Sequence, residues 1–348
     1  MATIATSDAR ALFTKMLIAV YKERKTPMSF LRSFFRIVEK STKELSIEVR
    51  RGTEKIAVDV ERGTEGNRNQ FSRSTEKIFV PPYYREYFDA TELDLYDRLF
   101  GSTEIDASVF SEFMESVAEK LLILQETIER AYELQCAQVL MTGIVSLQKG
   151  INIDFKRKAA SLVDGTATAW TGAVNPFDHM EAGANFIRQS GKAAGVVFNV
   201  IMGSLAIAAF KDNAKVKERQ NLYNYAPDLL LPAQRNAVGG SYHGQVEIGA
   251  YRANVWSYPE FYDNDAGVST PYIDPKKIVM LPENPNFVLG FAAVPQLVDE
   301  KNPTVKKGAF VIGDYKDERN HKHIHDIRSA GVAIPVAVDQ IYTRQVIA

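Results

Sequence analysis

The chain has 348 residues, which exceeds the roughly 250–300 at which a single hydrophobic core stops growing, so two domains are expected. Its 42 basic and 43 acidic residues leave a formal net charge of -1, which excludes a strong overall attraction to nucleic acid or membranes. The single cysteine, Cys136, excludes an intrachain disulfide and favours a reducing compartment, and the sequence predicts neither an export signal nor a membrane span.

The first part of the chain is expected to form two short amphipathic helices. Apolar residues recur at helical spacing over 8–22, and Thr26-Pro27 is a typical start for a second helix, which runs to Val38 and carries Phe30 and Phe34. The two helices could belong to the core, or they could form an arm that docks on a neighbouring molecule. The sequence leaves these two alternatives open.

A β-hairpin with a polar tip is expected next. Alternating segments are expected to form strands at 45–50, at 56–60 after a turn at 51–53, and at 77–80, and the segment 62–75 between the last two is almost free of apolar residues. The segments 52–58 and 74–80 nearly repeat each other in sequence, and we interpret them as matched arms of one hairpin. Arms of about ten residues span about 33 Å. Because a two-stranded ribbon of that length is marginal alone in water, we expect it to rest on another part of the chain or on another copy.

A long helix is expected from Ala107 to Gly143, because no proline or glycine interrupts this stretch. Its apolar stripe consists of Phe110, Met114, Val117, Leu121, Leu124, Ile128 and Ala131. The acidic residues lie largely outside the stripe and are expected to face solvent; they are Glu112, Glu115, Glu119, Glu126, Glu129 and Glu133. At about 1.5 Å per residue the helix is about 50 Å long, and strand-like sequence on both sides favours a spine for sheets over a coiled coil. Cys136 is interpreted as a small buried side chain within it.

Strands that alternate with helices predict a second domain from about residue 172. The expected elements are a helix near 177–190 opened by Pro176, a buried strand at 196–201, a helix at 202–210 and strands at 245–248, 253–258 and 277–281. The stretch 258–275 is interpreted as a long exposed loop. We expect the strand at 341–347 to join the domain that holds the long helix.

The most conspicuous polar cluster is His321, His323 and His325, followed by Asp326. Three imidazoles at a spacing of two share one face of a strand, and neutral imidazole is a good zinc ligand. Metallohydrolases usually place an acidic residue before the last histidine, and here the aspartate follows it, so a polar, partly exposed strand is favoured over a metal site. The basic run 156–158 is interpreted as a solvated strand end.

The sequence contains no nucleotide-binding loop, paired-cysteine site or calcium loop. We therefore predict no cofactor and no enzymatic activity.

Several short motifs occur together in a fixed order. They are Phe30-Leu-Arg-Ser-Phe-Phe-Arg36 followed by Ser41-Thr-Lys-Glu44, Pro81-Pro82 ahead of the long helix, Asn175-Pro176, Phe210-Lys211 with Val216-Lys-Glu218, and a tail with Pro335 that ends in Val346-Ile-Ala348. In this order and spacing the chain resembles the lambda-type major capsid protein E family of tailed phages. The resemblance covers nearly the whole chain.

The resemblance implies an α+β protein with the HK-97-type capsid fold. In that fold residues 1–44 are an N-terminal arm, and 45–85 are a strand and an extended β-hairpin loop. Residues 86–171 and 319–348 are a peripheral domain with the spine helix 107–143, and 172–318 are an axial domain. The inter-subunit contacts of the arm and loop are assigned to Phe30, Phe34, Arg51, Lys55, Arg62, Arg68 and Arg73.

The same resemblance implies a major capsid protein that self-assembles into hexamers and pentamers of an icosahedral shell around a double-stranded DNA phage genome. Its implied partners are a separate scaffolding protein, a portal, a possible decoration protein and packaged DNA held by non-specific contacts, with no membrane. Assembly is expected in the host cytoplasm and the final location in the virion capsid. Two alternatives are a tail-tube or connector subunit and a metal-dependent hydrolase that uses His321, His323 and His325.

Overall fold

The computed structural model describes residues 30–49, 75–91, 107–147, 152–170, 174–222, 234–235, 239–264, 266–299, 302–317 and 322–348. The helix expected at 8–22 and most of the polar tip of the hairpin lie outside these residues. No helix in the described ranges is both long enough and apolar enough to cross a membrane.

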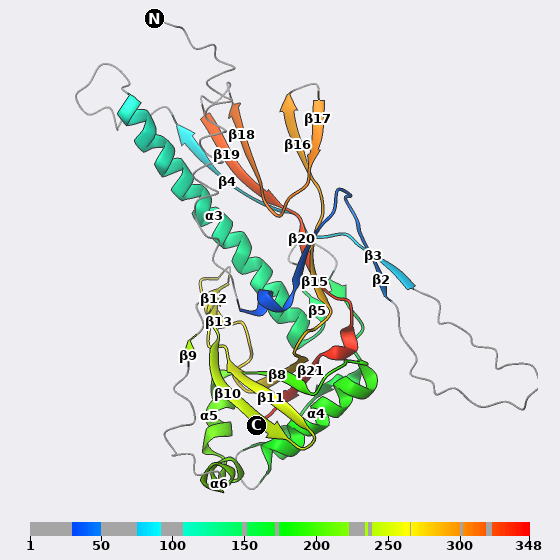
Figure 1. Cartoon of the computed structure of the whole chain (residues 1–348). Helices are drawn as coiled ribbons and strands as arrows, with labels where there is room; N and C mark the ends of the chain where they lie inside the picture. Colours follow the sequence, from blue (N-terminus) through cyan, green and yellow to red (C-terminus); the bar gives the residue numbers. More distant parts are fainter. Residues whose placement is uncertain are drawn as a thin grey trace, which may run out of the picture.

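The long helix α3 spans Ala107–Met141 and confirms the expected 107–143 within two residues. It runs diagonally through the molecule, with a three-stranded sheet beside its upper half and a larger sheet below its lower end (Figure 1). Gly143, just after the helix, has φ +76°, a conformation that glycine adopts without strain.

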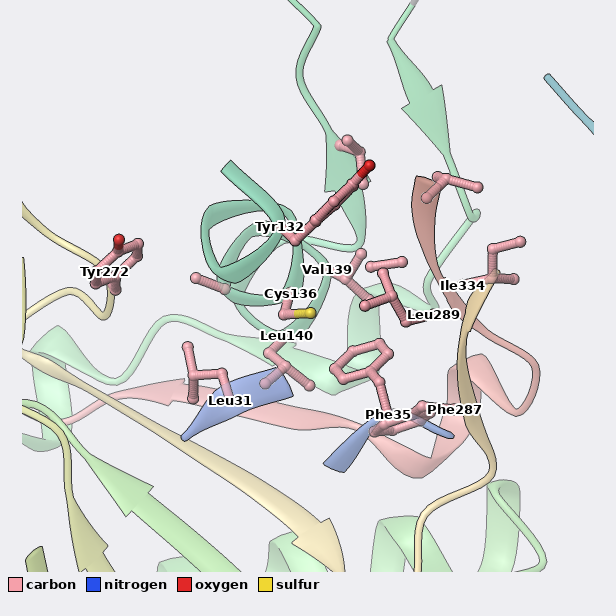
Figure 2. Packing of buried hydrophobic residues seen from close by; sticks show 14 of the residues in the cluster. Leu31, Phe35, Tyr132, Cys136, Val139, Leu140, Tyr272, Phe287, Leu289 and Ile334 are labelled. Carbon is pink, nitrogen blue, oxygen red and sulfur yellow. The ribbon is translucent and has the colours of Figure 1, made fainter. Parts of the chain in front are cut away.

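Three-stranded sheets pack along α3. The first has the order β18-β19-β4 and is antiparallel, and the second has the order β1-β15-β20. Their strands are β1 (Arg36–Glu39), β4 (Tyr84–Thr91), β15 (Phe287–Phe291), β18 (Val311–Asp317), β19 (Lys322–Ser329) and β20 (Gly331–Pro335). β15 and β20 are buried along their whole length, and their apolar side chains join those of α3 in one hydrophobic core (Figure 2).

Below α3 lies a seven-stranded mixed sheet with the order β7-β21-β14-β8-β11-β10-β9. Its strands are β7 (Leu162–Val163), β8 (Val197–Met202), β9 (Gln234–Arg235), β10 (Ser241–Ile248), β11 (Tyr251–Ser257), β14 (Lys277–Pro282) and β21 (Tyr342–Gln345). The helices that accompany it are α4 (Pro176–Ser190), α5 (Ser204–Asp212) and α6 (Ala214–Leu222). Asn175 caps α4 by accepting a hydrogen bond from the backbone N–H of Phe177, as the Asn-Pro sequence predicts. This sheet and these helices enclose a second hydrophobic core.

Four short 3₁₀ turns occur in the described residues: η1 (Leu31–Phe34), η2 (Ala159–Ser161), η3 (Thr166–Thr168) and η5 (Val338–Gln340). Four two-stranded sheets complete the described structure: β2 (Leu45–Val49) with β3 (Thr75–Phe79), β5 (Ile144–Val145) with β6 (Ile153–Asp154), β12 (Phe261–Asp263) with β13 (Ser269–Pro271), and β16 (Val294–Asp299) with β17 (Asn302–Lys306).

The prediction of a helix that reaches Val38 is wrong. The chain makes the single turn η1 and then enters β1, which pairs with β15 in parallel.

The near-repeat at 52–58 and 74–80 does not mark the strand pairing in the described hairpin. β3 pairs instead with β2, and Leu45 lies opposite Phe79 and Val49 opposite Thr75. The two described arms of the hairpin are therefore β2 and β3, which begin and end at the body of the protein.

The expectation for the final strand is also wrong. β21 pairs with β14 in the seven-stranded sheet, not with the sheets beside α3. Tyr342 packs in the second core, with its ring centroid 6.0 Å from that of Phe186, because β21 fills the edge that β14 leaves free. The next residue, Thr343, donates a hydrogen bond of 2.9 Å to the carbonyl of Leu140, so β21 also closes the end of α3.

The stretch 258–275 is not a simple exposed loop. It contains the β12–β13 hairpin, and Tyr258, Tyr272 and Ile273 are buried against the core around α3. The strands β15 and β18, which follow β14 of the seven-stranded sheet in sequence, also return to α3, because Phe287, Leu289 and Val311 belong to that same core.

Arg157 has a structural role that the sequence did not indicate. Its guanidinium donates to the carbonyl of Leu140 at 2.8 Å, to that of Ser161 at 3.1 Å and to that of Ile341 at 3.2 Å. Its side chain also lies against Gly143, where an added Cβ would come within 2.3 Å of the Cδ atom. The interpretation of this residue as part of a solvated strand end is wrong, because it joins the carbonyl of Leu140 at the end of α3 to the carbonyl groups of Ser161 and Ile341.

We predict that Arg157→Met lowers the free energy of unfolding by about 2 kcal/mol or more, because methionine keeps most of the packing volume but removes the guanidinium donor from the carbonyl groups of Leu140, Ser161 and Ile341. Thermal or urea unfolding of the unassembled chain measures this loss.

Lys156→Met is the matched control. The Lys156 side chain is 80% exposed and pairs with Asp154 at 2.7 Å, and exposed ion pairs of this kind contribute about 0–1 kcal/mol. Equal unfolding curves for the two variants would contradict the assigned role of Arg157.

Candidate assembly site

The N-terminal segment, here residues 30–34 with the turn η1, is joined to α3 by the buried carboxylate of Glu133. The carboxylate accepts hydrogen bonds from the backbone N–H of Leu31 at 2.9 Å and that of Arg32 at 3.1 Å, and from the hydroxyl of Tyr258 at 2.7 Å. Glu133 is 1% exposed. Burial is the larger effect and raises the pKa of its carboxyl above the usual value, although the three hydrogen bonds lower it. One side chain thus connects η1, α3 and the segment that follows β11.

A second buried glutamate lies one turn earlier on the helix. Glu129 accepts a hydrogen bond of 2.5 Å from Gln125 and forms an ion pair of 3.5 Å with Arg32. Burial raises the pKa of Glu129, and Gln125 and Arg32 lower it. The expectation that the acidic residues of α3 face solvent is therefore wrong for Glu129 and Glu133, whereas Glu126 does reach solvent and pairs with Arg130.

The described residues place the predicted contact residue Phe30 in the core of its own chain. Its ring is 2% exposed and lies 5.2 Å from that of Trp256 and 5.5 Å from that of Tyr258, centroid to centroid. This position leaves the ring no surface to offer to a neighbouring subunit. Phe34 packs edge-on against Phe30 and stays half-buried. The other predicted contact residues, Arg51, Lys55, Arg62, Arg68 and Arg73, lie outside the described residues.

The hairpin leaves the body from a fixed position. Leu45, at the start of β2, is 3% exposed and packs over Gly290 of β15, where an added Cβ would come within 2.8 Å of a leucine methyl group. The backbone ahead of it is held by hydrogen bonds from Lys40 N–H to the Phe291 carbonyl and from Ala293 N–H to the Thr42 carbonyl. Beyond this point β2 and β3 form a two-stranded sheet that no third strand joins within the described part of the chain.

Apolar side chains are exposed where the chain returns from the hairpin. The side chains of Val80, Tyr83 and Tyr87 are 58%, 49% and 59% exposed. Tyr87 lies on β4, two residues after Arg85, whose side chain is 40% exposed. Large apolar groups that gather on a surface often mark a contact with another protein. This surface adjoins the hairpin and was not indicated by the sequence.

The polar clusters offer little for catalysis. His243 Nε2 lies 2.7 Å from Ser257 Oγ, but both residues are buried, so this pair gives a substrate no access. His323 and His325 lie on β19 together with Asp314 of β18, a residue that the sequence did not single out, while His321 lies outside the described residues. Burial lowers the pKa of His325 below its usual value, although the neighbouring carboxylates of Asp314 and Asp326 raise it.

The fold has relatives among solved structures. A protein assigned as a prophage capsid protein of Escherichia coli CFT073 is 16% identical, with a TM-score of 0.59 and full coverage of both chains. A phage-related protein of Bordetella bronchiseptica RB50 is 11% identical, with a TM-score of 0.55 and coverage of 95% of this chain and 96% of the other. No curated protein sequence matches the chain.

These likenesses show that the chain has the HK-97-type capsid fold. The sequence profile of the family "Phage major capsid protein E" matches residues 13–323. The chain therefore belongs to the phage major capsid protein E family and is a capsid shell protein. The resemblance found in the sequence is confirmed, and a tail-tube, connector or hydrolase assignment is not favoured.

We predict that Glu133→Gln weakens the attachment of the N-terminal segment. The amide leaves a single acceptor oxygen for three donors and directs an N–H₂ group at a backbone N–H. The free energy of unfolding should fall by about 1–3 kcal/mol, and trypsin should cleave after Arg32 faster than in the parent chain.

Glu126→Gln makes the same chemical change on the same helix at a position that reaches solvent, and it should leave both measurements unchanged. If Glu133→Gln unfolded and was cleaved like this control, the carboxylate would not hold the segment.

Proposed function

We propose that this capsid protein forms the hexamers and pentamers of an icosahedral shell around a double-stranded DNA phage genome, with its hairpin lying on an adjacent subunit. The observation that carries the proposal is the β2–β3 ribbon, which is anchored at Leu45 and paired with no third strand in the described residues. A ribbon of two strands is marginal in water unless its face packs on something else. The exposed Val80, Tyr83 and Tyr87 beside it supply apolar surface for the same contact.

The division of the chain into an arm, an extended loop, a peripheral domain and an axial domain is part of this proposal. The two hydrophobic cores support it, since one surrounds α3 and the other lies between the seven-stranded sheet and its helices. We place the peripheral domain around α3 with β4, β18 and β19. We place the axial domain around the seven-stranded sheet, with β21 included.

The proposed partners follow from the shell. Scaffolding protein, portal and a possible decoration protein would come from other genes, and assembly would take place in the host cytoplasm. The net charge of -1 limits repulsion among many copies of the chain. Contacts with packaged DNA would then be local and independent of base sequence.

We predict that replacing residues 50–74 by Asn-Gly gives a folded chain that forms no closed particles. Val49 and Thr75 are a cross-strand pair, and a two-residue Asn-Gly turn is suited to close a hairpin at such a pair. The body should therefore keep its unfolding transition, while the contact with the neighbouring subunit is lost. Circular dichroism measures folding, and sedimentation with electron microscopy measures assembly.

The parent chain, co-produced with its scaffolding protein, is the reference for assembly. Closed shells of normal size from the shortened variant would overturn the proposed role of the hairpin. Rings or open tubes from the parent chain would overturn the shell itself.

A further inference from the structure

One group of potential metal ligands lies in the sheet beside the upper half of α3. His325 of β19 pairs in register with Asp314 of β18 and with Phe88 of β4. His323 precedes His325 by two residues and therefore lies on the same face of the strand. The side chains of Asp314 and His325 thus meet at the middle of the β18–β19 pair, in the sheet beside the upper half of α3 (Figure 1).

The distances suit a single ion. Nδ1 of His325 lies 3.5 Å from Oδ1 of Asp314, Nδ1 of His323 lies 3.9 Å from the same oxygen, and one ligand atom from each residue fits within a mutual separation of 4.8 Å. Two ligands bound to tetrahedral zinc at about 2.0–2.1 Å are about 3.3–3.4 Å apart. Small side-chain rotations therefore bring the three atoms to coordination distance.

The environment of the carboxylate points to a cation. Oδ1 of Asp314 is buried and accepts no hydrogen bond from the described residues. A buried carboxylate oxygen without a donor costs free energy unless a positive group lies beside it. Lys120 of α3 does not fill this role directly, because its ammonium group lies over the ring of Phe88, 5.4 Å from the centroid.

We propose that Asp314, His323 and His325 bind one divalent transition-metal ion of the zinc type. Two imidazoles and one carboxylate are a ligand set that zinc takes, with the fourth position open to water on the side of the exposed His323. The bound ion joins β18 to β19 at the middle of their pairing, within the sheet that packs on α3. The role is structural, and it is independent of the proposed contact of the hairpin.

The ligand set differs from the one that the sequence suggests. Three histidines at 321, 323 and 325 share a spacing of two, but the structure supplies the carboxylate of Asp314 from the neighbouring strand. The site is thus complete without His321. This difference gives the experiment its control.

The test uses the full-length chain without a histidine tag, stripped of metal with a chelator and then titrated with Zn²⁺ in a calorimeter. We expect one zinc per chain by calorimetry and by elemental analysis, and a zinc-dependent rise in the unfolding temperature. Co²⁺ in place of zinc should give the intense visible absorption of a four-coordinate site.

His323→Ala and Asp314→Asn should each weaken zinc binding by more than about 100-fold, the upper end of what loss of an outer partner costs. His321→Ala should bind like the parent chain. His323 is exposed, so its variant should fold normally, and the unfolding temperature of each variant in chelator checks this.

Less than one zinc per chain, or unchanged affinity in the His323 and Asp314 variants, would overturn the proposal. Loss of binding in His321→Ala would overturn the ligand set. None of these measurements depends on shell formation, so a failure of the zinc proposal would not contradict the proposed function.

Discussion

The burial of the C-terminal half of α3 is the constraint on which the rest of the described structure depends. A helix that is buried over most of its surface must find a partner for each polar side chain that it carries into the interior, because an unpaired buried polar group costs about 1–3 kcal/mol. Glu133 finds backbone N–H groups of the N-terminal segment. Gln135 accepts from Ala333 N–H of β20 and donates to the hydroxyl of Tyr84 on β4. The helix can be buried only when these distant segments are in place.

The same requirement explains why the N-terminal segment belongs to the body of the protein. The sequence left open whether Phe30 and Phe34 serve the core or a neighbouring molecule. The side chains of Phe30 and Leu31 fill the space beside α3, while the two N–H groups of η1 satisfy Glu133. The same few residues, Phe30 to Arg32, thus provide both apolar burial and hydrogen bonds to Glu133. Detaching this segment from α3 would lose both.

Local patterns predicted the elements well and their surroundings poorly. The stretch from Ala107 without proline or glycine predicted the long helix α3, and Asn175-Pro176 predicted the start of α4. Both predictions succeed because helix periodicity and capping are local properties. The prediction places all of the α3 glutamates in solvent, because a periodicity argument assigns charge to the outer face. Glu129 and Glu133 lie where α3 is covered by other segments, so they are buried in spite of their charge. The near-repeat around residues 52 and 74 misplaced the hairpin register for a related reason. Similar sequences show similar strand propensity, but pairing is set by the anchor at Leu45.

Partners that come from another strand were beyond the reach of sequence patterns. The spacing of His323 and His325 was visible in one strand, but Asp314 enters only through its register with His325. The final strand joined the wrong sheet in the prediction because nothing in its composition distinguishes the free edge of β14 from other edges. The same difficulty is greater for a capsid shell protein, because contacts with other copies of the chain leave no pattern along one strand or helix. The contact of Leu45 with Gly290 of β15 fixes where the β2–β3 ribbon leaves the body. In the proposed shell, a ribbon held in a fixed direction would let many modest contacts add up around a closed lattice.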